Sequence, residues 1–63
     1  MNPNDSLLID ERAVAKALTV SLATVRRWRY EGGGPPFLKI GALVRYRREA
    51  IDAWLEAKAV AHA

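Results

Sequence analysis

Residues 21–37 read Ser-Leu-Ala-Thr-Val-Arg-Arg-Trp-Arg-Tyr-Glu-Gly-Gly-Gly-Pro-Pro-Phe, and this stretch decides the fold. Ser21 is a good helix N-cap, and the Gly and Pro residues at 32–36 cannot continue a helix. Between these two signals, apolar side chains recur at the spacing of one helix face: Leu22, Val25 and Trp28. The stretch therefore predicts a short helix with an apolar stripe on one side and a polar, basic face on the other.

A second short helix is predicted just upstream. Asp10 is a good N-cap, and Glu11 adds negative charge to the first turn. Apolar side chains then recur at helical spacing: Val14, Ala17 and Leu18. We therefore expect a helix over residues 11–18. The break at residues 19–20 leaves a turn of about three residues before the next helix, as in a helix-turn-helix motif.

A hairpin and a third helix are predicted downstream of the glycines. The β-prone segments 37–40 and 43–46 flank Gly41-Ala42, which is typical of a tight hairpin with a type II′ turn. Residues 48–58 then show the apolar spacing of an amphipathic helix: Ile51, Trp54 and Leu55. The order helix, helix, two-stranded hairpin, helix predicts an α+β fold, the winged helix-turn-helix, whose wing is the hairpin.

The length of the chain limits it to one small domain. With 63 residues, it buries only about 60% of the surface that the unfolded chain exposes, which argues against a catalytic cavity. We expect residues 1–6 to be disordered, residues 7–59 to form the winged helix-turn-helix domain and residues 60–63 to fray.

The sequence contains no pattern typical of a catalytic site or a metal site. The carboxylates of the last predicted helix are interpreted as its solvated face: Glu49, Asp52 and Glu56. The glycines at 32–34 follow a helix and lead into proline, whereas a phosphate loop follows a strand and opens a helix. There is no cysteine, and His62 alone cannot form a metal site. We therefore expect no catalysis, no metal and no cofactor.

No feature of the sequence directs it to a membrane. No apolar run reaches the roughly 20 residues that span a bilayer. The first residues carry no basic cluster ahead of an apolar stretch, so no signal peptide is expected. We expect a cytoplasmic protein that does not bind membranes.

The positive charge of the chain is concentrated in its middle. The net charge is only +3, but residues 26–48 hold seven of the ten basic residues and one of the seven acidic ones. That segment carries +6 and the rest of the chain −3. Such a distribution is typical of a surface that binds a polyanion, although a solvated basic surface without a partner has the same composition.

The basic helix is the strongest candidate for contact with double-stranded DNA. A helix fits the major groove, where Arg can donate two hydrogen bonds to guanine and Ser or Thr can bond to bases or phosphates. Ala23 is small enough to let the backbone approach, and its methyl group can touch a thymine. The candidates are Ser21, Ala23, Thr24, Arg26 and Arg27. The alternative for the two arginines is a solvent-facing helix. Trp28 and Trp54 are interpreted as core residues.

The hairpin supplies a second group of basic residues: Lys39, Arg45 and Arg47. They could straddle the adjacent DNA backbone or enter the minor groove. The alternative is an edge hairpin that its charges protect against aggregation.

Four segments together resemble the excisionase-like, MerR-superfamily winged helix-turn-helix domains of bacteria and their phages. They are Ser21-Leu-Ala-Thr-Val-Arg-Arg-Trp28, Gly34-Pro-Pro-Phe-Leu-Lys-Ile-Gly41, Val44-Arg-Tyr-Arg47 and Ile51-Asp-Ala-Trp-Leu55. The resemblance covers most of the chain, from Leu7 to Lys58. Each segment alone is a weak signal, whereas their order and spacing together are specific.

The resemblance implies that the second helix is the recognition helix and the hairpin is the wing. DNA contacts are then expected from Ser21, Thr24, Arg26 and Arg27 in the helix, and from Lys39, Arg45 and Arg47 in the wing. The implied core consists of Leu18, Val25, Trp28, Ile40, Ile51, Trp54 and Leu55. One departure is the wing tip, where the family often carries Arg after the Gly and this chain has Gly41-Ala42-Leu43. The wing could instead hold phosphates through Lys39 and Arg45, or Leu43 could serve protein contacts.

The resemblance also implies a role. MerR regulators proper add a long dimerisation helix and a ligand domain, and this chain ends soon after the third helix. It is therefore similar to excisionases (recombination directionality factors of phages and integrative elements), which bind adjacent sites cooperatively and bend DNA so that an integrase favours excision. The implied partners are DNA, further copies of the chain on DNA and an integrase, on the nucleoid of a bacterial host.

Two alternatives stay open from the sequence. The first is a small AlpA-type transcriptional regulator that uses the same recognition helix and wing. The second is a protein-interaction module whose basic face binds an acidic partner, such as an integrase or a terminase assembly.

Overall fold

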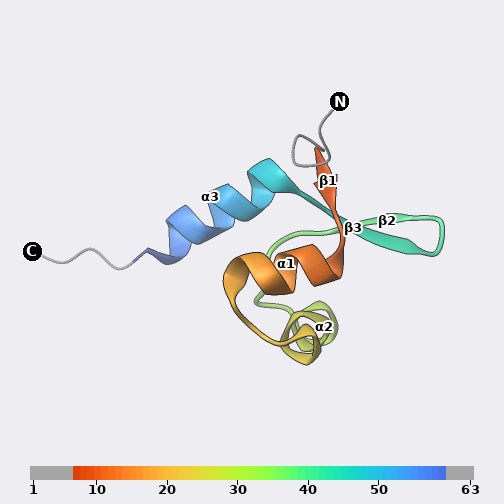
Figure 1. Ribbon diagram of the computed structural model, residues 1–63, viewed down its shortest axis with the longest axis horizontal. Coiled ribbons are helices and arrows are strands. Elements are labelled where there is room, and N and C mark those ends of the chain that lie inside the picture. The colour runs from red at the N-terminus through yellow and green to blue at the C-terminus, as the bar shows by residue number, and fades with distance from the viewer. Residues whose placement is uncertain (1–6, 60–63) are drawn as a thin grey trace, which may run out of the picture.

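The computed structural model describes residues 7–59, so the expected disorder at 1–6 and fraying at 60–63 lie outside the described residues. Within them the elements are β1 (Leu8–Ile9), α1 (Glu11–Leu18), α2 (Leu22–Glu31), β2 (Leu38–Ile40), β3 (Leu43–Arg47) and α3 (Arg48–Lys58) (Figure 1). The order helix, helix, hairpin, helix confirms the α+β winged helix-turn-helix fold. The three helices have the extents that the sequence predicts, and the hairpin strands differ from prediction by one residue each.

Both helices of the motif begin at the caps that the sequence indicates. The Asp10 carboxylate accepts a hydrogen bond from the backbone N–H of Ala13 at 2.9 Å. Ser21 Oγ accepts one from the backbone N–H of Thr24 at 3.1 Å. Each cap satisfies one of the N–H groups that a helix start leaves without a partner, and so fixes where the helix begins.

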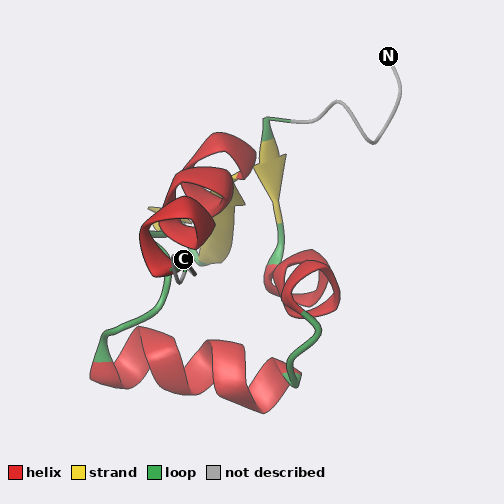
Figure 2. Ribbon diagram, turned by 90° about the vertical axis from the view of Figure 1, so that its left-hand side faces the viewer, coloured by secondary structure: helices red, strands yellow, loops and turns green. Residues whose placement is uncertain are grey.

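The turn between the helices closes α1 with a left-handed residue. Thr19 has a φ of 56° and a ψ of 46°, and the N–H of Val20 bonds back to the carbonyl of Ala15 at 3.0 Å. These bonds satisfy carbonyl groups at the end of α1, and the left-handed residue changes the direction of the chain within one turn. As a result α2 crosses α1 at a steep angle: Figure 2 shows α1 end-on while α2 runs lengthwise.

The sheet contains one strand, β1, that the sequence pattern did not predict. The sheet has the strand order β1-β3-β2, and both pairings are antiparallel. β1 pairs with β3 through Leu8 opposite Arg47 and Ile9 opposite Tyr46. Leu8 and Ile9, just before α1, therefore form the third strand of the sheet, and the wing strand β3 lies at its centre.

The wing itself is the hairpin of β2 and β3, which projects from the body of the domain (Figure 1). Its turn is Gly41-Ala42, where Gly41 has a φ of 63° and Ala42 does not have a positive φ. A positive φ at the first turn residue alone is what a type II′ turn requires.

The described residues form one small hydrophobic core. Four elements contribute buried side chains: Val14 and Ala15 of α1, Val25 of α2, Tyr46 of β3 and Ile51 of α3. Other apolar residues pack against them while partly exposed: Ile9, Leu18, Val20, Trp28 and Val44. The core thus holds α2 and the wing strand against α1, which sets the position of α2 relative to the wing.

The expected core is wrong at two positions. Ile40 is 49% exposed because the wing carries it away from the body of the domain, and Leu55 is 42% exposed on α3, which runs out beyond the sheet (Figure 1). Val25 and Ile51 are buried as expected, and Leu18 and Trp28 are half-buried. Trp54 is also half-buried, with its ring centroid 5.5 Å from that of Trp28.

Candidate nucleic-acid interface

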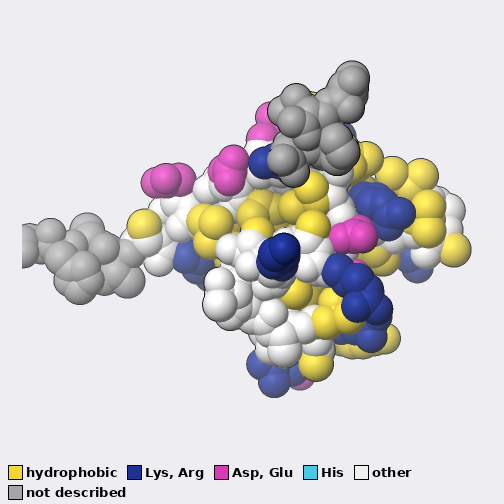
Figure 3. Space-filling view, in the orientation of Figure 1, with side chains coloured by type: hydrophobic (Ala, Val, Ile, Leu, Met, Phe, Trp, Pro, Cys, Tyr) yellow, Lys and Arg dark blue, Asp and Glu magenta, His cyan; other side chains and the backbone are white. Residues whose placement is uncertain are grey.

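Positive side chains gather on the side of the domain where α1 and α2 meet the wing, with an acidic side chain between them (Figure 3). The same side carries a cleft of about 360 Å³ between the two helices and the wing. Its charged lining residues are Asp10, Glu11, Arg12, Arg26, Arg29 and Arg45. Of the eight residues that the sequence analysis assigned to DNA, this cleft brings together Arg26 and Arg45.

The beginning of α2 carries two hydroxyl side chains, of which Ser21 is exposed and Thr24 is half-buried. Ser21 Oγ and Thr24 Oγ1 lie 2.9 Å apart, and the same Ser21 oxygen caps the helix. Ala23 is exposed between them. The Ser21 hydroxyl therefore has two partners within the helix, the backbone N–H and the side-chain hydroxyl of Thr24. These three residues present a small, polar helix end that another molecule can approach closely.

Arg27 is the most accessible arginine of α2 for which an ion pair is found. Its side chain is 62% exposed, and its Nε lies 4.0 Å from a carboxylate oxygen of Glu31, one turn further along. An exposed pair at this distance contributes little to stability. Most of the Arg27 guanidinium therefore faces solvent.

Arg26 is held by an acidic residue of α1. Its Nη2 donates to Glu11 Oε2 at 2.7 Å, and its Nε lies 3.3 Å from both oxygens of the same carboxylate. The Arg26 side chain is nevertheless 49% exposed. The pair fixes the direction of the guanidinium and leaves part of it open to solvent in the cleft.

Arg29 has a structural role that the sequence analysis missed. Its Nη2 lies 2.9 Å from Glu11 Oε1, and its Nη1 donates to the hydroxyl of the buried Tyr46 at 3.3 Å. Only 19% of the Arg29 side chain is exposed. Arg29 thus links α1, α2 and β3, and no local spacing in the sequence could have revealed its two partners.

Glu11 is strongly acidic in this setting. The hydrogen bond from Arg26, together with that from Arg29, lowers the pKa of its carboxyl from 4.5 to about 2, although partial burial acts in the opposite direction. Glu11 also raises the pKa of Arg26. The carboxylate is therefore ionised at any pH at which the protein would meet DNA, and it holds two arginines of α2 at the floor of the cleft.

The wing does not present its basic residues on one face. Arg45 pairs with Leu38 across the hairpin, whereas Lys39 pairs with Val44. Because residues directly opposite share a face and successive residues alternate, Lys39 and Arg45 lie on opposite faces. Arg45 is half-buried, and its Nη1 donates to the carbonyl of Val44 at 2.7 Å.

Arg47 lies apart from the cleft. It is exposed at the end of β3, where it lines a smaller hollow with Phe37 and Ala50. Arg47 is therefore separate from the arginines that line the cleft. It lies at the base of the wing, whereas Lys39 and Arg45 lie further along the hairpin.

Two further features were sought in the part of the chain that the structure describes, a metal-binding cluster and a membrane-spanning helix. Among residues 7–59, no group of three His, Cys, Asp or Glu side chains is placed to hold a metal ion. None of the helices described is long and apolar enough to cross a membrane.

Comparison with known proteins agrees with this geometry. The sequence pattern of the helix-turn-helix domain family matches residues 10–59, from the cap of α1 to the residue after α3. A comparison with curated proteins gave no match. Helix-turn-helix domains are DNA-binding units and are generally not enzymes, so the match indicates DNA binding. The chain belongs to the helix-turn-helix domain family.

Proposed function

We propose that the protein binds double-stranded DNA sequence-specifically, with α2 in the major groove and the wing on the adjacent backbone. The observation that carries this proposal is the exposed start and outer face of α2, with Ser21, Ala23 and Arg27, beside a basic wing. The apolar face of the same helix is occupied by the core through Val25. Only the polar face is therefore free for a groove.

The candidate residues are expected to make different kinds of contact with DNA, according to their position on α2 or on the wing. Arg27 is the candidate for reading a base, because it is exposed and only weakly paired. Ser21 and Ala23 allow close approach at the start of α2, where free N–H groups favour a phosphate. Arg26 adds a guanidinium held in place by Glu11. Lys39, Arg45 and Arg47 are the candidates for backbone contacts, and the opposite faces of Lys39 and Arg45 suit a wing that straddles one strand.

The role that we propose is architectural, of the excisionase type. The support for it is the resemblance of four segments to excisionase-like domains. Such a protein acts on the bacterial nucleoid, and several copies bind adjacent sites and bend the DNA for an integrase. Bending a short site costs about 1–6 kcal/mol, which several weakly binding copies together can offset. A small transcriptional regulator of AlpA type would use the same surface.

The experiment is a gel-shift titration of the full chain at near-physiological salt. The probes tile the promoter of its own gene and any neighbouring integrase attachment site, and unrelated DNA of equal length is the control. We expect a cooperative ladder of bands on repeats beside the attachment site. A single complex confined to the promoter would replace the architectural role with the regulator. No preference over the control DNA would overturn sequence-specific binding and favour an acidic protein partner.

A further inference from the structure

We infer that the cleft between α1, α2 and the wing is a phosphate-binding site, and that Arg12 of α1 is a DNA-backbone contact within it. This inference rests on the proposed function. Arg12 lies outside the basic segment 26–48 and outside every residue set that the motif and wing patterns single out. The observations that carry it are the position of the cleft and the pairing of the charges that line it.

The position of the cleft determines what crosses it. In duplex DNA, a sugar-phosphate strand separates the major groove from the neighbouring minor groove. If α2 occupies the major groove and the wing reaches the next backbone or the minor groove, that strand must pass between them. The cleft is the space between them, lined by residues of α1, α2 and the wing.

The charges that line the cleft are not equivalent. Arg26 and Arg29 both bond to Glu11, and the Asp10 carboxylate accepts the N–H of Ala13 at the start of α1. These groups have partners within the protein. They form a network of charge pairs and hydrogen bonds within the protein.

Two cations of the cleft have no carboxylate partner within residues 7–59: Arg12 and Arg45. Arg45 donates one of its N–H groups to a backbone carbonyl and keeps the others. Arg12 is exposed on the first turn of α1. A guanidinium with free donors and no counter-charge is suited to a phosphate oxygen, which accepts charge-assisted hydrogen bonds.

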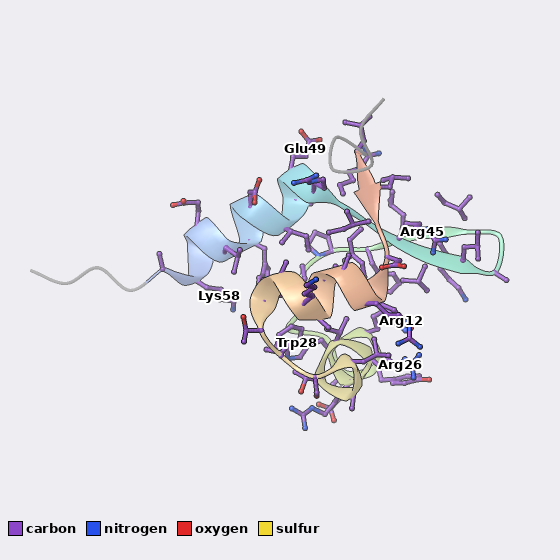
Figure 4. The ribbon with its side chains drawn as sticks, in the orientation of Figure 1. Arg12, Arg26, Trp28, Arg45, Glu49 and Lys58 are labelled. Carbon is purple, nitrogen blue, oxygen red and sulfur yellow. The ribbon has the colours of Figure 1, made fainter. Side chains whose placement is uncertain are left out.

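The side-chain view supports this placement. Figure 4 shows Arg12, at the start of α1 on the side of the wing, beside Arg26 of α2, while Arg45 lies on the wing strand itself. A strand that crosses the cleft therefore meets Arg12 from the helix side and Arg45 from the wing side. Lys58 lies at the far end of α3, away from all three.

The test measures the salt dependence of DNA binding by full-length Arg12→Gln. Each phosphate contact contributes about 0.9 to the slope of log K against log salt, so we expect the slope to fall by about 1. We expect binding to weaken by roughly three- to tenfold, equally for the preferred site and for unrelated DNA, because a phosphate carries no sequence information. Arg12→Lys keeps the charge and should keep the slope.

The matched control is Lys58→Gln, which also lowers the net charge of +3 by one but lies far from the cleft. Its slope should equal that of the wild type. Circular dichroism of both variants checks that the fold is retained.

Three outcomes would overturn the inference. If Arg12→Gln binds like the wild type or like Lys58→Gln, Arg12 contacts no phosphate, although the proposed function survives. If it loses affinity for the preferred site alone, Arg12 contacts a base. If the wild-type protein binds no DNA, both the inference and the proposed function fail.

Discussion

The side chain of Trp28 lies directly against the backbone of Gly34. A Cβ atom built on Gly34 would fall 2.5 Å from Trp28 Cβ and 2.9 Å from its Cγ. These are the inner atoms of the side chain, which cannot move without shifting α2. We therefore expect Gly34→Ala to lower the free energy of unfolding by about 1–3 kcal/mol, in the range of overpacked cores.

Urea denaturation followed by tryptophan fluorescence measures this loss. The control is Ala53→Ser, which adds one atom on an exposed position of α3 and should change stability by no more than about 0.5 kcal/mol. Equal midpoints for the two variants would contradict the close contact between Trp28 and Gly34.

Glu11 gives the protein a specific sensitivity to acid. Its pKa is about 2 in the folded protein and about 4.5 when unfolded. Above pH 4.5 the carboxylate is ionised in both states and its stabilisation is fully present. As the pH falls from 4.5 towards 2, the unfolded chain takes up the proton first, so this stabilisation is lost. We expect Glu11→Gln to remove this part of the pH dependence.

At neutral pH, Glu11→Gln should also lower the free energy of unfolding by about 1–2 kcal/mol, because two arginines lose a charged partner. The matched control is Glu56→Gln on the exposed surface of α3, where no ion pair is found within residues 7–59. Thermal unfolding from pH 2 to pH 7 compares the three proteins. Parallel pH profiles for the wild type and Glu11→Gln would show that the pair contributes nothing.

Ser21 is expected to have two separable roles, as a helix cap and as a DNA contact. Ser21→Ala removes the cap and should cost about 0.5–2 kcal/mol of stability. Ser21→Asp keeps a capping oxygen but places a negative charge where a phosphate would lie, so we expect normal stability and at least roughly tenfold weaker DNA binding.

Ser21→Asn is the neutral control, since Asn caps as well as Asp. Thermal unfolding and fluorescence anisotropy with labelled DNA separate the two effects. If the Asp and Asn variants bind DNA equally well, the start of α2 does not approach a phosphate.

Arg27 and Arg45 should differ in the kind of binding they support. Arg27→Ala should cost about 1–3 kcal/mol on the preferred site and much less on unrelated DNA, as expected for a base contact. Arg45→Ala should weaken binding to both DNAs alike and reduce the salt slope, as expected for a backbone contact. Anisotropy titrations at several salt concentrations distinguish them. Equal losses of specificity from both variants would contradict this division.

The sequence was sufficient for the parts of the fold that depend on neighbouring residues. Asp10 and Ser21 cap the helices that follow them, and the glycines after Glu31 end α2, so the helix bounds could be predicted closely. β1 could not, because two residues show no periodicity and form a strand only by pairing with β3. A strand this short is defined by its partner.

Burial and pairing across the core were also beyond local patterns. Tyr46 is 1% exposed and Ile40 is 49% exposed, although both lie in β-prone segments of the same hairpin. What separates them is how far along the wing each lies, which depends on packing of the whole domain. For the same reason, the bonds of Arg29 to Glu11 and Tyr46 were not predicted, because the three residues come from different elements.

The pairing of β1 with β3 has a consequence for how the protein is made. Synthesis runs from the N-terminus, so β1 leaves the ribosome first, whereas β3 and its last residue, Arg47, leave much later. α1 and α2 can pack on each other earlier, because their contacts join nearby segments. The sheet therefore cannot be completed before β3 has left the ribosome, and until then β1 lacks the strand with which it pairs.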